Sequence, residues 1–296
     1  MKLEQVKAMI AAQGYITGED VAMSVFLSLQ LNKPLLVEGP AGVGKTEIAK
    51  VMANALQTDL IRLQCYEGLD ATHALYEWNY QRQLLHIKLT EHSGQSLDEK
   101  EQTIFSDSFL MKRPLLQAIT HYRKPVLLID EIDRSDEEFE SFLLEVLSDW
   151  QITIPETGTI RASHIPQVIL TGNRTRELSE ALRRRCLYLY IDYPDFQKEL
   201  AIVTARLPSI NETLATAITG FMQELRKKKL EKTPGIAETL DWAAALATLH
   251  IDHLDKSIIS QTLGVIIKEW RDTREVQLSL NDLLEKTGIT SKLDKV

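Results

Sequence analysis

Short apolar runs alternate with helical patterns over roughly the first two thirds of the chain. The run at 126–130 is almost wholly apolar, which is typical of a strand covered on both faces of a parallel sheet. Similar runs predict further strands at 34–38, 60–64, 167–171 and 187–191. Strands separated by helices predict an open parallel sheet flanked by helices, so the expected fold class is α/β.

Helical periodicity fills the first of these gaps and dominates the chain after Pro194. One helix is expected up to about residue 31, and another from a glycine-rich turn to about residue 57. Later helices are expected at about 195–206, 211–229, 236–250 and 255–271. We therefore predict an α/β domain over residues 1–193 and a smaller, all-helical lid domain over 194–296.

An insertion of helices or a hairpin is expected within 66–108, where the alternation of strands and helices stops. Its aromatic segment, 76–80, suits packing of the insertion or an interface better than stacking on nucleic-acid bases.

Composition narrows the class of protein. With 296 residues, 44% apolar and 26% charged, the chain can bury a sizeable core, which argues against disorder. The net charge of −8 argues against a general nucleic-acid binder. No apolar run is long enough for a signal peptide or for membrane insertion, and Cys65 and Cys186 are expected to be reduced thiols. We expect a cytoplasmic protein.

A phosphate-binding loop follows the first predicted strand. The pattern G-x-x-x-x-G-K-[ST] is matched by Gly39, Pro40, Ala41, Gly42, Val43, Gly44, Lys45 and Thr46. Glycines let backbone N–H groups close around a phosphate, and the helix N-terminus that follows adds a favourable dipole. Lys45 is expected to reach the β- and γ-phosphates of ATP, and the Thr46 hydroxyl to ligate Mg²⁺.

Two carboxylates end the apolar strand at 126–130. Asp130 is expected to hold Mg²⁺, partly through water, and Glu131 to activate an attacking water as a general base. Asn173 ends the next strand and is predicted to orient that water or to contact the γ-phosphate.

Two basic clusters have different interpretations. Arg183, Arg184 and Arg185 precede the last predicted strand and are candidates for an arginine finger that acts on a neighbouring subunit's nucleotide. The run at 226–229 is interpreted as a solvated helix end.

The ordered motifs resemble those of AAA+ ATPases, and within them the MoxR family. The likeness rests on GPAGVGKT, on DEIDR at 130–134, which is similar to the family's D-E-I-N-R, and on LSEALRRRC at 178–186, which places Arg185 on the finger position. Segments such as CYEGLD at 65–70 and YEWNY at 76–80 resemble the CoxD-type subgroup, named for carbon monoxide dehydrogenase maturation.

This resemblance implies a ring-forming homo-oligomer, usually a hexamer, with nucleotide sites at subunit interfaces. It implies a von Willebrand factor A-domain (VWA) protein as partner, and a chaperone-like role toward a client complex, often a metalloenzyme. Gln64 is positioned like the polar residue that contacts the catalytic Glu in many AAA+ proteins. Many relatives open a lid helix with S-P-R-A, but residues 233–238 read TPGIAE, so no sensor-2 arginine is assigned.

Three hypotheses remain at this point. The first is an Mg²⁺-dependent ATPase that remodels a protein client. The second is an ATP-gated binding scaffold with slow or incidental hydrolysis, which the absence of a sensor-2 arginine favours. The third is a DNA-directed AAA+ motor, which needs a DNA-binding module that the sequence does not reveal.

Overall fold

The computed structural model describes residues 2–91 and 96–289. Residues 92–95 of the predicted insertion, the first residue of the predicted α/β domain and the last seven of the predicted lid domain lie outside the described residues. Contacts divide the chain into two compact units. Unit 1 contains residues up to Lys7, then Glu19–Glu38 and Thr46–Tyr190. Unit 2 contains Ala8–Gly18, Gly39–Lys45 and the chain from Ile191 onward. The domain boundary between 193 and 194 stays a prediction.

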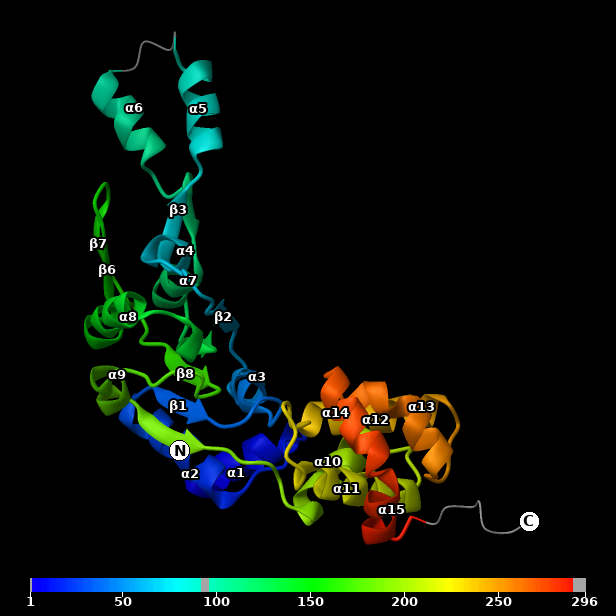
Figure 1. Cartoon of the computed structure of the whole chain (residues 1–296). Coiled ribbons are helices and arrows are strands. Elements are labelled where there is room, and N and C mark those ends of the chain that lie inside the picture. The colour runs from blue at the N-terminus through cyan, green and yellow to red at the C-terminus, as the bar shows by residue number, and fades with distance from the viewer. Residues whose placement is uncertain (1, 92–95, 290–296) are drawn as a thin grey trace. The chain divides into compact units, whose positions relative to one another are not determined.

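Unit 1 is built on a parallel five-stranded sheet in the order β2-β5-β8-β1-β9 (Figure 1). Its strands are β1 (Leu35–Glu38), β2 (Leu60–Gln64), β5 (Val126–Asp130), β8 (Gln167–Gly172) and β9 (Leu187–Tyr190). Each predicted strand is present and differs from its predicted range by at most one residue at either end. The register pairs Gln64 with Asp130 and Glu38 with Gly172, which aligns the polar strand ends along one edge of the sheet.

Helices cover this sheet and bury its apolar strands. The helices of unit 1 include α2 (Glu19–Leu31), α3 (Lys45–Ala55, whose first residue belongs to unit 2), α4 (Ala71–Leu75), α7 (Pro114–Ile119), the short 3₁₀ helix η1 (Ile132–Arg134), α8 (Glu137–Asp149) and α9 (Glu180–Arg185). A further helix, α1 (Leu3–Ala12), opens the chain and has residues in both units. Every residue of β5 and β8 is buried, as expected for strands covered on both faces.

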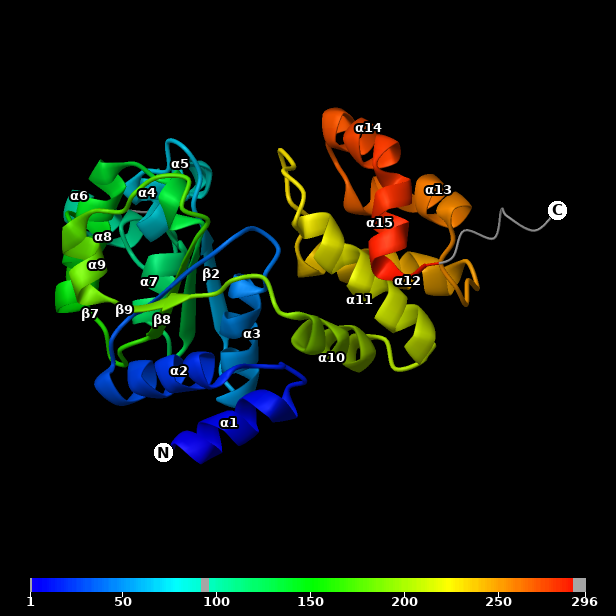
Figure 2. The same ribbon diagram turned by 60° about the horizontal axis from the view of Figure 1, so that its bottom comes forward.

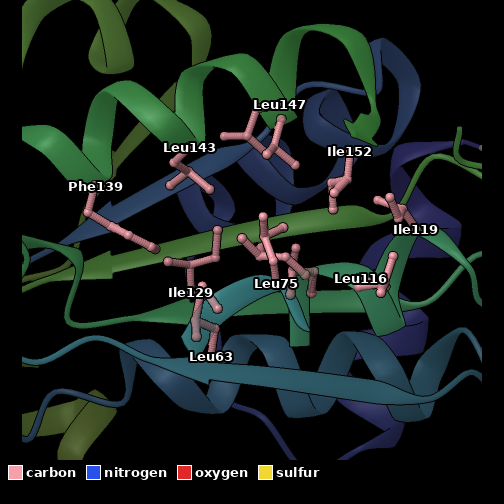
Figure 3. Packing of buried hydrophobic residues seen from close by; sticks show 14 of the residues in the cluster. Leu63, Leu75, Leu116, Ile119, Ile129, Phe139, Leu143, Leu147 and Ile152 are labelled. Carbon is pink, nitrogen blue, oxygen red and sulfur yellow. The ribbon is translucent and has the colours of Figure 1, made fainter. Parts of the chain in front are cut away.

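The core of unit 1 is easiest to see beneath α8. Figure 3 shows Phe139, Leu143 and Leu147 of this helix pointing onto the strands, toward Ile129. These three positions recur at intervals of four residues, so one helical face is apolar and packs on the sheet. The helix thereby fixes the position of the loop between β5 and α8, which carries the acidic motif.

The region around the predicted insertion contains two helices and a small sheet. Strands β3 (Tyr76–Trp78) and β4 (Leu110–Lys112) pair antiparallel, and α5 (Tyr80–Leu89) and α6 (Leu97–Ile104) lie between them in the sequence (Figure 1). Trp78 is 5% exposed and packs edge-on against Phe105, which supports a packing role for this aromatic residue. Tyr80 is 63% exposed and does not share that role.

An additional hairpin follows α8 and was not predicted. Its strands β6 (Gln151–Ile154) and β7 (Gly158–Arg161) form a separate antiparallel ribbon. β7 is short and largely exposed, so the sequence has no apolar run there to indicate a strand.

Unit 2 is helical after β9 (Figure 2). Its helices are α10 (Phe196–Arg206), α11 (Glu212–Arg226), α12 (Ile236–Thr248), α13 (Lys256–Ile266), α14 (Trp270–Leu278) and α15 (Leu280–Thr287). The prediction of one helix over 255–271 is wrong, because the backbone is extended at Ile267 and a second helix begins at Trp270. Among the described residues of both units, we find no helix with the length and apolar character required to cross a membrane.

Arg226 corrects the interpretation of 226–229 as a solvated helix end. Its side chain is 7% exposed and forms a two-pronged salt bridge with Glu199, whose side chain is fully buried. Arg226 also donates to the carbonyls of Pro234 and Gly235, just before α12. A buried carboxylate requires such a partner, whereas the neighbouring Lys227 is 68% exposed and fits the original interpretation.

We predict that Arg226→Ala lowers the free energy of unfolding by about 3–5 kcal/mol, because it leaves Glu199 charged, buried and without its guanidinium partner. Lys227→Ala is the matched control and is expected to change stability by less than about 0.5 kcal/mol. Urea denaturation followed by circular dichroism measures both. Equal stabilities of the two variants would contradict a structural role for Arg226.

Candidate nucleotide-binding site

The predicted phosphate-binding loop runs from Gly39 to Thr46, and its residues Gly39–Lys45 belong to unit 2 while Thr46 belongs to unit 1. Lys45 is 7% exposed, and its ammonium group donates to the carbonyls of Gly39 (2.9 Å) and Pro40 (2.6 Å). The loop thus curls around its own lysine, while α3 begins at that residue. A helix N-terminus next to a fixed ammonium group is a favourable environment for phosphate oxygens.

Two glycines of the loop are required by close backbone approaches. A Cβ atom at Gly39 would lie 2.0 Å from the carbonyl oxygen of Ile191. Gly42 has a φ of +75° and accepts a hydrogen bond from the backbone N–H of Ile236, the first residue of α12 (2.9 Å). Gly235 packs against Gly42 so closely that a side chain at position 235 would collide with the loop.

This contact gives the TPGIAE segment a physical role. In place of a side chain that opens the helix, α12 presents its backbone N–H groups to the loop, with Ile236 and Ala237 both donating to the Gly42 carbonyl. The Glu238 carboxylate caps the N–H of Gly235 at 2.8 Å and completes the turn.

Asp130, at the end of β5, is the centre of a second set of contacts, which lies in unit 1. Its side chain is only 5% exposed. Oδ1 accepts hydrogen bonds from the hydroxyls of Thr46 (3.0 Å) and Thr171 (2.5 Å), and Oδ2 accepts one from the Arg62 guanidinium (2.5 Å). The carboxylate and the Thr46 hydroxyl are oxygen ligands of the kind that Mg²⁺ prefers, so these two residues fit a magnesium ion.

Glu131 follows directly, in a left-handed backbone conformation with φ of +56°. Such a conformation is uncommon outside glycine and costs free energy. The Glu131 N–H donates to the Thr171 hydroxyl (3.0 Å), and its carboxylate accepts from Gln64 (3.1 Å) and Arg134 (3.0 Å). The predicted partner Gln64 does contact Glu131.

A backbone hydrogen bond helps to fix the position of Asn173. Its N–H donates to the Asp133 carboxylate (3.0 Å), which also accepts from the N–H and the hydroxyl of Thr175. Asp133 is 3% exposed. Asp133 therefore supplies a buried carboxylate that organises the loop after β8.

Arg185 bonds residues of α8 and α9 and not these carboxylates. Its guanidinium donates to the Ser148 hydroxyl and to the Ala181 carbonyl, on α8 and α9. The other arginines of the cluster point elsewhere, as helical spacing requires: Arg184 pairs with Glu180, and Arg183 lies over the ring of Tyr188. The start of α9 is anchored by Glu140, which accepts from the N–H of Ser179.

Glu38 is a buried residue of this edge that our sequence analysis missed. It ends β1 with 7% of its side chain exposed and accepts a hydrogen bond from the Tyr188 hydroxyl at 2.9 Å. Burial and this hydrogen bond raise the pKa of Tyr188. The sequence signal that could have identified Glu38 is its charge, because it ends an otherwise apolar strand directly before the glycine-rich loop.

The two cysteines are free thiols, as expected. Burial raises the pKa of Cys65 to about 12, and the nearby carboxylates of Asp130, Asp133 and Glu131 add to the effect. Burial alone raises the pKa of Cys186 to about 12. Both are therefore protonated and poorly nucleophilic at neutral pH.

Comparison with known families agrees with this arrangement. The family model described as "AAA domain (dynein-related subfamily)" matches residues 34–186, slightly more than half of the chain. The chain therefore belongs to this family of AAA+ ATPases. Its fold is the parallel P-loop sheet flanked by helices, followed by a helical C-terminal region.

Similar sequences occur in staphylococci. A protein of Staphylococcus epidermidis, named only as uncharacterized, is 29% identical over 259 residues, covering 85% of this chain and 90% of that protein. An uncharacterized protein of Staphylococcus haemolyticus is 26% identical over 285 residues, covering 92% and 98%.

Among solved structures, a mutant of Thermotoga maritima RuvB, a Holliday junction branch migration motor, has a TM-score of 0.50 at 21% identity. The match covers 94% of this chain and 84% of that chain. This likeness shows the fold alone.

We predict that Asp133→Ala lowers the free energy of unfolding by about 1–3 kcal/mol, because it leaves the part-buried N–H groups of Asn173 and Thr175 without this acceptor. Amide hydrogen exchange at Asn173 and Thr175 should accelerate. Asp133→Asn retains an accepting oxygen and is expected to lose less stability. Unchanged exchange at both amides in Asp133→Ala would show that other contacts hold this loop.

Proposed function

We propose that this chain is an Mg²⁺-dependent ATPase of the MoxR type, which hydrolyses ATP to ADP and phosphate. The observation that carries the proposal is the cluster in which Thr171 bonds both the Asp130 carboxylate and the backbone of Glu131, with Thr46 on the same carboxylate. It joins the predicted metal ligands to the predicted general base through one hydroxyl.

The phosphate loop binds the nucleotide in this proposal. Its backbone N–H groups and the N-terminus of α3 surround the phosphates, and the Lys45 ammonium exchanges its loop carbonyls for phosphate oxygens. Thr46 and Asp130 would hold Mg²⁺, partly through water. When bound, the ion neutralises charge on the phosphates and orients them.

Glu131 acts as the general base toward water. Gln64 and Arg134 both donate to its Oε2 and hold the carboxylate in place, so the proton from water is accepted at Oε1. Asn173, fixed by Asp133, orients that water or contacts the γ-phosphate.

We assign Arg185 as the arginine finger of a ring-shaped homo-oligomer, a hexamer in the resembled family. Its exposed position on α9, where it bonds Ser148 of α8, suits action on a neighbouring subunit. The function served by hydrolysis is chaperone-like remodelling of a protein client, with a VWA-domain protein as partner. Assembly or activation of a metalloenzyme in the cytoplasm fits the CoxD-type motifs.

A second candidate is an ATP-gated binding scaffold with slow or incidental hydrolysis. The observation that favours it is the start of α12, where Gly235 and backbone N–H groups occupy the place of an arginine side chain. The ATPase rate measured with and without a VWA-type partner separates the two candidates, since a scaffold stays slow in both.

We predict that Glu131→Gln lowers the steady-state ATPase rate at least about 100-fold, because the amide cannot accept the proton of water. The dissociation constant for ATP should stay within about threefold, since Glu131 is not a phosphate ligand. A phosphate-release assay and equilibrium binding measure the two quantities. Glu138→Gln, an exposed change on α8, is the control; unchanged turnover in Glu131→Gln would sink the assignment.

We predict that Arg185→Ala and Lys45→Ala are each inactive alone and recover activity when mixed. In a random equal mixture, about a quarter of sites combine an intact Lys45 with an intact Arg185 from the next subunit, so about a quarter of wild-type activity should return.

Mixing Lys45→Ala with Glu131→Gln is the matched control. Both residues serve the same subunit's nucleotide in this proposal, so no combination of neighbours restores a site. Recovery in the control, or none in the Arg185 mixture, would refute action of Arg185 across a subunit boundary.

A further inference from the structure

A guanidinium group forms a salt bridge with the carboxylate that is expected to hold the metal. Arg62 lies on β2, and its Nη2 donates to Asp130 Oδ2 at 2.5 Å. The two residues belong to adjacent strands, whose register pairs Arg62 with Leu128 and Gln64 with Asp130. No family motif in the sequence singled out Arg62.

Charge explains why Asp130 takes this partner. The other donors on its carboxylate, the hydroxyls of Thr46 and Thr171, are neutral and both use Oδ1. An ionised carboxylate that is 5% exposed is costly without a counter-charge, and Arg62 supplies one at Oδ2.

The Arg62 side chain is also placed so that it can leave Asp130 easily. The Arg62 side chain is 53% exposed, so it reaches Asp130 from the solvent side and needs no repacking to withdraw. The same Nη2 donates to Gln64 Oε1 at 2.5 Å. Arg62 can therefore give up Asp130 and keep a hydrogen-bonding partner.

Arg62 and a divalent cation cannot share Asp130 freely. Both are positive, both are attracted to the same carboxylate, and they repel each other at short range. By linkage, each must weaken the binding of the other.

We propose that Arg62 competes with Mg²⁺ for Asp130 and so sets the Mg²⁺ concentration at which the nucleotide site fills. Arg62 is thus a positioning residue that acts through Asp130, with Gln64 as its alternative partner. The inference rests on the proposed function, because it assumes that Asp130 serves the metal of a nucleotide site.

The test measures binding of a fluorescent ADP analogue to the full chain as Mg²⁺ is titrated, which needs no hydrolysis. In Arg62→Gln the Mg²⁺ midpoint should fall by about 5- to 20-fold, because the competing charge is gone. The ATPase rate at saturating Mg²⁺ should stay within about threefold of wild type, since Mg²⁺ has then already displaced Arg62.

A second variant moves the midpoint the other way. Gln64→Ala removes the alternative acceptor, holds Arg62 more firmly on Asp130, and should raise the Mg²⁺ midpoint by about 2- to 5-fold. Its expected effect does not depend on how well Arg62→Gln folds.

Arg123→Gln is the matched control. It removes another partly exposed arginine that pairs with an aspartate, Asp59, next to the start of β2. Its midpoint should equal that of wild type.

Opposite shifts in Arg62→Gln and Gln64→Ala support the proposal. A midpoint in Arg62→Gln equal to or above that of wild type overturns it, as does loss of turnover at saturating Mg²⁺ with an unchanged midpoint. ADP binding by the wild-type chain that ignores Mg²⁺ has a different meaning: it overturns the metal role in the proposed function itself.

Discussion

The buried carboxylate of Asp130 is the constraint on which the arrangement of unit 1 depends. A charge at the end of a fully buried strand must be satisfied by donors brought from elsewhere in the chain. Here they come from α3, β8 and β2, through Thr46, Thr171 and Arg62. The parallel register brings these elements to one edge of the sheet. The same hydrogen bonds therefore stabilise the buried charge and assemble the candidate site.

Much of this could be predicted from the sequence, for a clear physical reason. Strands covered on both faces are continuous apolar runs, and the carboxyl ends of parallel strands meet at one edge, so the apolar runs placed Asp130 and Asn173 at the ends of neighbouring strands. The helix over 255–271 failed, because amphipathic periodicity does not register a short extended break at Ile267.

The buried ion pairs that escaped prediction join residues far apart in the sequence. Arg62 reads as a polar position on a half-buried strand, and its partner lies 68 positions away. Arg226 reads as one member of a basic run, yet it is buried because α10 supplies Glu199 at zero exposure. Side-chain pairing across elements depends on tertiary packing, and composition gives it no local signature.

The backbone at Glu131 has a consequence for sequence drift. With φ at +56°, the position accepts glycine, asparagine or aspartate without much strain, and it resists valine, isoleucine or threonine. A residue that replaces Glu131 must meet two independent requirements: it must supply a carboxylate, and it must adopt a left-handed backbone conformation. Glutamate satisfies the first and only tolerates the second, so the turn is kept by the hydrogen bond from its N–H to Thr171, not by the intrinsic preference of its side chain.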